Sequence, residues 1–239
     1  MTLSTKIKKH IKQPGFLGYL SSLIYFTYGG GVKSGLRQAY NRQGFDMRYG
    51  VDTSESLCSG PKGSEGIDAT YEDVKYAVNN VPDKVERIKE GINILKGQYY
   101  MPCRQTAFLD FGSGKGRALI VASKLGFSSL IGIEFSLNEF KVCKKNLIKL
   151  KISSRLFFDS IRRVDFQSEV IEEKYILIYA YNPSSIEIIA EACNNVIQAY
   201  PGKKIFLMYT NPQGDVANHI TSPILKIFSR NKLDCYELL

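Results

Sequence analysis

Residues 106–116 read TAFLDFGSGKG, and this stretch decides the fold that the sequence predicts. It begins with a mostly apolar run of the kind that forms a buried parallel strand. Three alternating glycines, Gly112, Gly114 and Gly116, follow at once, and RALIVASKL (117–125) then has the apolar spacing of a helix. A strand, a glycine turn and a helix in immediate succession indicate one βα unit of an open sheet, where ligands bind beyond the carboxyl ends of the strands.

Strands and helices alternate on both sides of this unit. Upstream, a helix is expected from Pro82 to Gly97, because apolar residues recur there at helical spacing and a glycine can end the helix. Downstream, strand, helix, strand, helix, strand and hairpin are expected over residues 129–135, 137–151, 175–181, 186–199, 204–209 and 224–239. This order predicts the α/β class, with a doubly wound, mostly parallel sheet, helices on both faces and a C-terminal antiparallel hairpin.

The N-terminal part of the chain is basic and partly apolar. Residues 1–50 hold eight Lys or Arg against one acid, although the whole chain of 239 residues has a net charge of only +9. Charge confined to one terminal segment speaks against a basic face that wraps a nucleic acid. It favours an acidic protein partner or an anionic membrane surface, or else a solvated tail. The apolar stretch 16–28 is too short to span a bilayer, which takes about 20 residues.

Length and composition fit one α/β domain with an extension. We expect a helical extension over residues 1–50, a loop or lid rich in Gly and Ser over 51–80, and the α/β domain over 81–239. Five cysteines are scattered singly, none of them in a Cys-x-x-Cys pair, and there are two histidines. This pattern predicts reduced thiols in a cytoplasmic protein without a metal site.

Glu134 stands at the end of the strand that follows the glycine turn. A carboxylate in that position can accept hydrogen bonds from both ribose hydroxyls of an adenosine-containing ligand. Such a ligand could be a nicotinamide dinucleotide or the methyl donor S-adenosylmethionine. The site predicted at this edge is therefore one for an adenosine cofactor of either kind.

Three details favour the methyl donor. The dinucleotide fingerprint G-x-G-x-x-G would require a glycine at the position of Arg117. Asp110 puts negative charge close to where a pyrophosphate would lie, but it would attract a cationic sulfonium with an ammonium group. A phosphate-binding loop of the form G-x-x-x-x-G-K-[ST] is absent from the sequence.

FLDFGSGKGRALIVASKLG (108–126) followed by LIGIEFS (130–136) resembles motif I and the acidic residue after it in class I S-adenosylmethionine-dependent methyltransferases. The resemblance implies a seven-stranded Rossmann-like sheet whose last strand is antiparallel, and S-adenosyl-L-methionine as cofactor. It implies that Glu134 binds the ribose and Asp110 lies near the amino-acid end of the cofactor. The residues that it places beside the cofactor are Gly112, Ser113, Gly114, Gly116 and Phe135.

Acceptor residues are predicted with less support from the sequence. Tyr181-Asn182-Pro183 is similar to the Asn-Pro-Pro-aromatic motif of amino-group methyltransferases, but serines replace its last two residues, so a simple strand-ending turn is an equal alternative. Asp165 could flank the adenine. DFGSGKG and the upstream DATYEDVKY resemble the non-SET nucleosomal lysine methyltransferases, which would bring Tyr71 to the cofactor.

The function that these residues predict is methyl transfer to an N or O nucleophile of a protein side chain, a small molecule or a glycan. Two alternatives remain open at this point, namely a nicotinamide-dependent oxidoreductase and a non-catalytic protein that binds the cofactor or a partner.

Overall fold

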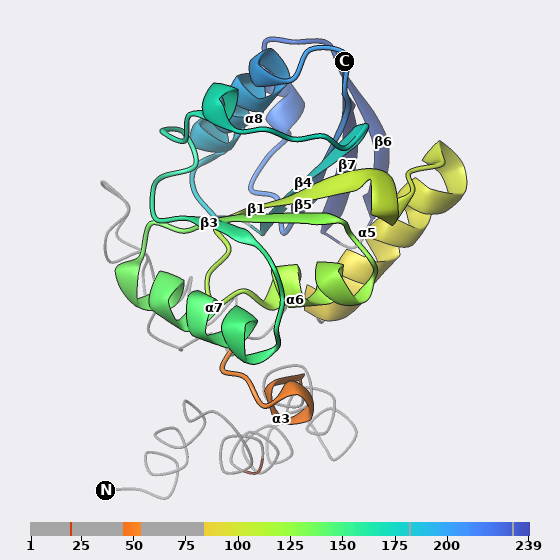
Figure 1. The fold of residues 1–239 in the computed structure, drawn as a ribbon. Helices are drawn as coiled ribbons and strands as arrows, with labels where there is room; N and C mark the ends of the chain where they lie inside the picture. Colours follow the sequence, from red (N-terminus) through yellow and green to blue (C-terminus); the bar gives the residue numbers. More distant parts are fainter. Residues whose placement is uncertain (1–19, 21–44, 54–83, 182, 231) are drawn as a thin grey trace, which may run out of the picture.

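The computed structural model describes residue 20 and residues 45–53, 84–181, 183–230 and 232–239. These residues form a seven-stranded sheet in the order β3-β2-β1-β4-β5-β7-β6, with helices on both faces (Figure 1). The strands are β1 (Thr106–Phe111), β2 (Ser129–Ile133), β3 (Arg155–Phe157), β4 (Tyr175–Tyr181), β5 (Lys204–Thr210), β6 (Ile224–Arg230) and β7 (Leu233–Leu238).

The first five strands are parallel, and β7 runs antiparallel between β5 and β6. The predicted fold class is therefore confirmed, including the C-terminal hairpin and the seven-stranded Rossmann-like sheet that the resemblance implied. The strand order reverses between β1 and β4, because the chain builds outward from β1 to β3 before it returns. Open α/β sheets bind ligands at the carboxyl ends of the strands at such a reversal.

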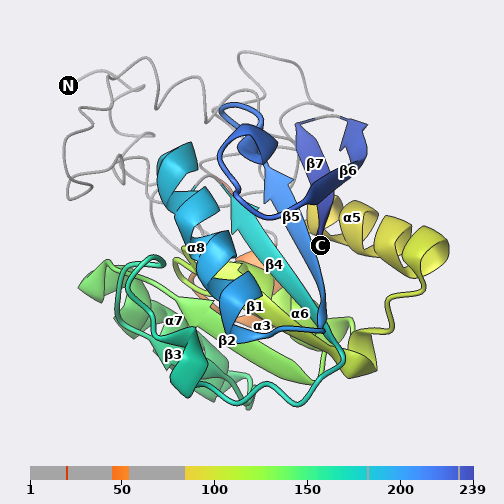
Figure 2. The same cartoon turned by 90° about the horizontal axis from the view of Figure 1, so that it is seen from above.

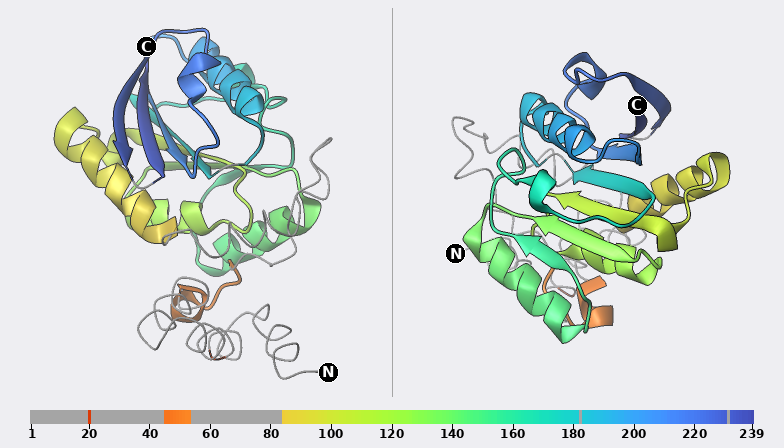
Figure 3. Two further views of the ribbon diagram at one scale, coloured as in Figure 1. Left: turned by 180° about the vertical axis from the view of Figure 1, so that it is seen from behind. Right: turned by 45° about the horizontal axis from the view of Figure 1, so that its top comes forward.

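Helices cover the two faces of this sheet unequally. The longer helices are α5 (Lys84–Tyr99), α6 (Arg117–Lys124), α7 (Leu137–Lys149) and α8 (Ile186–Ala199). Helix α8 lies across one face, and α5, α6 and α7 lie on the other (Figures 2 and 3). Short helices are α3 (Phe45–Tyr49), η2 (Cys103–Gln105), η3 (Phe166–Ser168) and η4 (Val216–Asn218).

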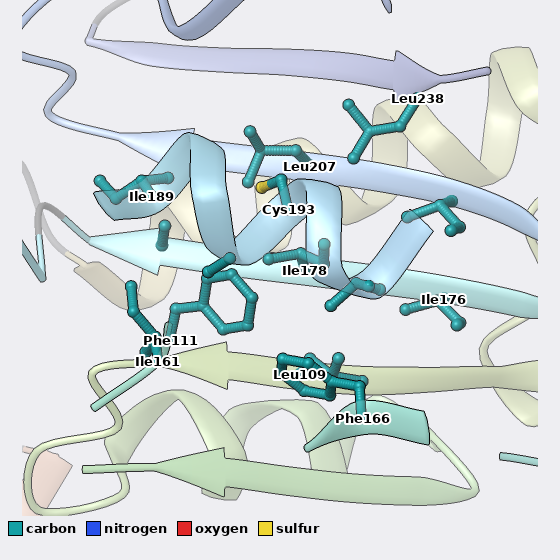
Figure 4. Close-up of a cluster of buried hydrophobic side chains, with 14 of the residues drawn as sticks. Leu109, Phe111, Ile161, Phe166, Ile176, Ile178, Ile189, Cys193, Leu207 and Leu238 are labelled. Atoms are coloured by element: carbon teal, nitrogen blue, oxygen red, sulfur yellow. The ribbon is translucent and has the colours of Figure 1, made fainter. Parts of the chain in front are cut away.

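Alternation along each strand builds two apolar cores. In β1, Leu109 and Phe111 point to the α8 face, where they meet Ile178 of β4 and Cys193 of α8 (Figure 4). Phe108 between them belongs to the opposite core, under α5, α6 and α7. Every residue of β1 is buried, as expected for a central parallel strand covered on both sides.

Helix α5 continues to Tyr99, so the prediction that Gly97 ends it is wrong. The ring of Tyr99 packs edge-on against Phe206, with 6.0 Å between ring centroids, and this contact with the sheet holds the last turn in place. Tyr100, the residue directly after the helix, has a left-handed φ of 52° that ends it.

The expected extension and lid lie almost wholly outside the described residues. Apart from residue 20, residues 45–53 are the exception: α3 has Phe45 and Asp46 buried, and the Val51 N–H donates to the Asp46 carbonyl at 3.0 Å. The boundary expected after residue 50 thus falls inside one hydrogen-bonded segment. No helix in the described part of the chain has the length and apolar character needed to cross a membrane.

Candidate functional site

Residues 112–116 turn the chain from the end of β1 into α6. The N–H groups of Gly112 and Ser113 both donate to the Ile133 carbonyl, at 3.0 and 2.9 Å, which ties the loop to the end of β2. The Gly116 N–H donates to the Ser113 carbonyl at 2.9 Å and closes a tight turn. We call residues 112–116 the glycine loop.

The three glycines of the loop have different surroundings. All have positive φ, at 73° for Gly112, 53° for Gly114 and 86° for Gly116, a region that residues with a side chain rarely adopt. A Cβ at Gly112 would lie 2.4 Å from the Cβ of Pro183, and one at Gly116 would lie 2.8 Å from the Sγ of Cys143. At Gly114, no atom of the described residues lies within 4 Å of that position. Only Gly114 therefore leaves open space where a side chain would stand.

Glu134 follows β2 and closes against the loop. Its Oε2 accepts a hydrogen bond from the Gly114 N–H at 2.8 Å, and its Oε1 accepts one from the Ser136 N–H at 2.7 Å. The residue is only 5% exposed. A carboxylate has about four acceptor positions, so these two backbone donors leave each oxygen able to accept a further hydrogen bond.

Asp110 of β1 and Ser113 of the loop both act on the buried thiol of Cys143, a residue of α7. Burial and the negative charge of Asp110, with a smaller contribution from Glu134, raise the pKa of the Cys143 thiol to about 12. A hydrogen bond with Ser113 opposes that shift in the pKa. Two carboxylates therefore share the space around a thiol that stays neutral at physiological pH.

The two cations of this region, Lys115 and Arg117, are paired with acids on the far side of the loop. Lys115 Nζ lies 3.0 Å from Asp52 Oδ1, and Arg117 lies 3.5 Å from the buried Asp46 carboxylate. Arg117 stands where a dinucleotide fingerprint would have its third glycine. Its guanidinium points to α3 and packs over the Phe45 ring, with 5.3 Å between Cζ and the ring centroid.

Aromatic side chains and a carboxylate follow β2 and β3. Phe135, 44% exposed, comes next to Glu134, and Phe158, 51% exposed, comes directly after β3. Glu134 donates its N–H to the Phe157 carbonyl at 3.0 Å, so the two strand ends are adjacent. Asp159 then accepts hydrogen bonds from Arg163, which lower the pKa of its carboxyl group.

The prediction that Asp165 flanks the adenine concerns a residue that follows β3 at a distance along the chain. Asp165 is exposed and sits at the N-cap of η3, where its side chain accepts a hydrogen bond from the Gln167 N–H at 3.1 Å. Phe166 beside it is buried against Phe111 in the α8 core. Asp159 comes two residues after Phe157 and is therefore nearer the end of β3 in the chain than Asp165 is.

The predicted acceptor residues are only partly described. Asn182 and Tyr71 lie outside the described residues. Tyr181 ends β4 opposite Thr210 of β5 and is half-buried on the face that carries α5 and α6. Pro183 packs against Gly112, and this contact joins the end of β4 to the glycine loop.

A second polar cluster lies by the end of β5, and nothing in the sequence reasoning anticipated it. The Tyr236 hydroxyl lies 2.9 Å from Asp215 Oδ1 and 3.1 Å from Asp234 Oδ2. Lys226 Nζ lies 2.7 Å from Asp215, and this hydrogen bond lowers the pKa of the Asp215 carboxyl. Ser229 donates to the other oxygen of Asp234 at 2.7 Å. We call these five residues the β7 cluster.

Comparison with known proteins gives matches only among solved structures. No protein-family model matches the chain, and no curated protein sequence matches it either. A structure of a Leishmania major S-adenosylmethionine-dependent methyltransferase is 15% identical, with a TM-score of 0.49, over 65% of this chain and 72% of that one.

Two further structures come from RNA-modifying proteins. An RNA methyltransferase of Salinibacter ruber in complex with S-adenosyl-L-homocysteine is 15% identical, with a TM-score of 0.44, over 64% of this chain and 88% of that one. An rRNA methylase of Streptococcus thermophilus is 13% identical, with a TM-score of 0.43, over 64% of this chain and 97% of that one. Identities and TM-scores this low do not show what this chain binds or modifies.

Proposed function

We propose that the chain is a class I S-adenosylmethionine-dependent methyltransferase. It transfers a methyl group to an N or O nucleophile of an acceptor that is a protein side chain, a small molecule or a glycan. The observation that carries this proposal is the charge arrangement around the glycine loop, where two carboxylates act on Cys143 and the cations Lys115 and Arg117 each have an acidic partner.

The charges decide between the two kinds of adenosine ligand. Lys115 and Arg117 are neutralised by Asp52 and Asp46, so they are poorly placed to meet a pyrophosphate. Asp110 and Glu134 both act electrostatically on Cys143 under the loop. The negative charge of these two carboxylates attracts a cationic sulfonium with an ammonium group and repels a pyrophosphate. The nicotinamide alternative is accordingly not favoured.

The ribose and adenine parts of the donor have matching groups. Glu134 accepts two backbone hydrogen bonds and retains acceptor positions for ribose hydroxyls. The space at Gly114, which no other described residue enters, allows a ligand to approach the bare backbone. Phe135 offers an exposed aromatic side chain next to Glu134, suited to packing against a flat base.

The chain's contribution to the reaction is positioning. Bound S-adenosylmethionine supplies an activated methyl group, which needs no covalent enzyme intermediate. The loop and Glu134 fix the donor end, and Tyr181 and Pro183, at the end of β4 next to Gly112, form the adjoining wall on which an acceptor would be oriented. Correct alignment of two reactants contributes several kcal/mol to lowering the barrier.

Calorimetry with S-adenosylhomocysteine and NAD⁺ tests this proposal. We expect a dissociation constant on the order of micromolar for S-adenosylhomocysteine, and no heat with NAD⁺. Bound ligand should also raise the melting temperature, because it binds only the folded state. Binding of NAD⁺ in place of S-adenosylhomocysteine, or of neither, would overturn the proposal.

A further inference from the structure

Residues 45–53 lie next to α6 and α7 (Figures 1 and 3), and they contact Lys115 of the glycine loop and Arg117 directly after it. One anchor is Arg117, the first residue of α6. Its Nε donates to the Thr53 hydroxyl oxygen at 2.9 Å, and the Thr53 hydroxyl donates to Asp46. The Asp46 side chain is completely buried and lies 3.5 Å from the Arg117 guanidinium. Arg117 therefore joins this segment to the helix that the glycine loop starts.

The second anchor is Asn146, a buried residue of α7. Its side-chain amide pairs with the backbone of Asp52: Oδ1 accepts from the Asp52 N–H at 3.2 Å, and Nδ2 donates to the Asp52 carbonyl at 2.7 Å. The same Nδ2 also donates to the Lys115 carbonyl, within the loop, at 3.0 Å. One side chain thus holds the segment and the loop together, and the Lys115–Asp52 ion pair lies beside it.

The loop needs such anchors because of its composition. Three glycines at positive φ within five residues lose more conformational freedom on ordering than other residues would. On the site side, the loop is held by the hydrogen bond from Gly114 to Glu134. On the opposite side, Lys115 and Arg117 are held by residues 45–53. A loop fixed before the ligand arrives spares the ligand the entropic cost of ordering it.

We infer that residues 45–53, through Asp46, Thr53 and the partner residue Asn146, are a positioning device for the cofactor site. They hold Gly114 and its N–H in the arrangement that a ligand meets, and they touch neither the ligand nor the acceptor. This inference rests on the proposed function, since it concerns affinity for the same donor. Of these groups, Asn146 has the most direct hold on the loop.

Two variants test it against a matched control. Asn146→Leu removes both sets of amide hydrogen bonds at similar volume, and Thr53→Val removes only the hydroxyl between Asp46 and Arg117. Tyr200→Phe is the control, because it removes one hydrogen bond of a buried side chain, to the Glu169 carbonyl at 3.0 Å, at the end of α8. We expect affinity for S-adenosylhomocysteine to fall about tenfold in Asn146→Leu and about threefold in Thr53→Val, as preorganisation is lost. Tyr200→Phe should lower the melting temperature with unchanged affinity.

Hydrogen exchange of the native protein supplies a readout that general destabilisation does not give. Coupling between two sites is reciprocal, so S-adenosylhomocysteine should slow amide exchange in residues 45–53 as well as in the loop. Equal affinity in native protein and both variants, or ligand protection confined to the loop, would overturn the inference alone. If Asn146→Leu does not fold, Thr53→Val and the exchange measurement decide. Native protein that fails to bind S-adenosylhomocysteine would overturn the proposed function together with this inference.

Discussion

Glu134 and Asp234 are both buried carboxylates near the carboxyl ends of the parallel strands, but different kinds of group satisfy them. Glu134, after β2, accepts from the backbone N–H groups of Gly114 and Ser136. Asp234, opposite Tyr209 of β5, faces the side chains of Ser229, Tyr236 and Lys226. Around Glu134, the donors are backbone N–H groups of a glycine-rich loop, and they leave room for a ligand. Around Asp234, side chains hydrogen-bond to one another and occupy the space themselves.

This difference explains why the region of the glycine loop and Glu134 says more about the ligand than the β7 cluster does. Around the glycine loop, a position that no other described atom approaches and two carboxylates, one of them with spare acceptor positions, together favour one ligand chemistry. In the β7 cluster, the Tyr236 hydroxyl and the Lys226 ammonium already compensate both carboxylates. We expect substitutions around the glycine loop to affect ligand affinity, and substitutions in the β7 cluster to affect stability.

The largest effect is expected from Gly114→Leu. A leucine there would fill the open space over the loop and should weaken S-adenosylhomocysteine binding by at least about a hundredfold, or about 2.7 kcal/mol. Gly126→Leu is the matched control, because Gly126 also has positive φ and, among described residues, no atom within 4 Å of a Cβ. Both variants should melt at similarly lowered temperatures. Equal affinities in the two variants would show that the ligand does not pass over Gly114.

Glu134→Ala should have the next largest effect. Loss of charge-assisted hydrogen bonds to the ribose should weaken binding by about 1.5–3 kcal/mol, measured by calorimetry. Asp234→Asn alters a buried carboxylate of the β7 cluster and should leave the affinity unchanged. The comparison fails if Asp234→Asn weakens binding as much as Glu134→Ala does.

Tyr236→Phe should act on stability. Burial raises the pKa of the Tyr236 hydroxyl, and the charges of Asp234 and Asp215 raise it further, so this group stays protonated and donates a hydrogen bond. Its removal leaves two carboxylates with one partner fewer and should lower the free energy of unfolding by about 1–3 kcal/mol in urea denaturation. A loss of ligand affinity without a loss of stability would assign the β7 cluster to the binding site instead.

Thiol reactivity should show the smallest effect. Burial raises the pKa of both Cys143, under the glycine loop, and Cys235, in β7, to about 12. At pH 8 the thiolate fraction of each is about a thousandfold below that of an ordinary cysteine, so iodoacetamide should leave both unmodified in the folded protein. Any slow modification should be faster at Cys143 than at Cys235, because opening of the glycine loop would expose the Cys143 thiol. Bound ligand should suppress this modification of Cys143. If mass spectrometry shows that ligand protects Cys235 from iodoacetamide as much as it protects Cys143, the distinction between the glycine loop region and the β7 cluster fails.

Local sequence patterns predict the fold and the cofactor site around the glycine loop. The strand TAFLDF, the glycines and Glu134 lie close together in the chain, and each pattern reports a local constraint. Strand β3 escaped notice because it has three residues, all half-buried, and therefore has no apolar run.

Contacts between distant parts of the chain left no local pattern. Arg117 and Thr53 are 64 positions apart, and Asn146 and Asp52 are 94 apart. The sequence showed only that Arg117 replaces a glycine of the dinucleotide fingerprint. That it anchors residues 45–53 follows from tertiary packing, as does the meeting of Asp215 with Tyr236.

A crystal structure of the complex with S-adenosylhomocysteine tests the central claim most directly. The account predicts both ribose hydroxyls within about 3.2 Å of the Glu134 carboxylate oxygens. It further predicts that the ligand crosses the open face of Gly114, with its ammonium group towards Asp110. A ligand bound at another edge of the sheet, or a ribose that makes no contact with Glu134, would contradict it.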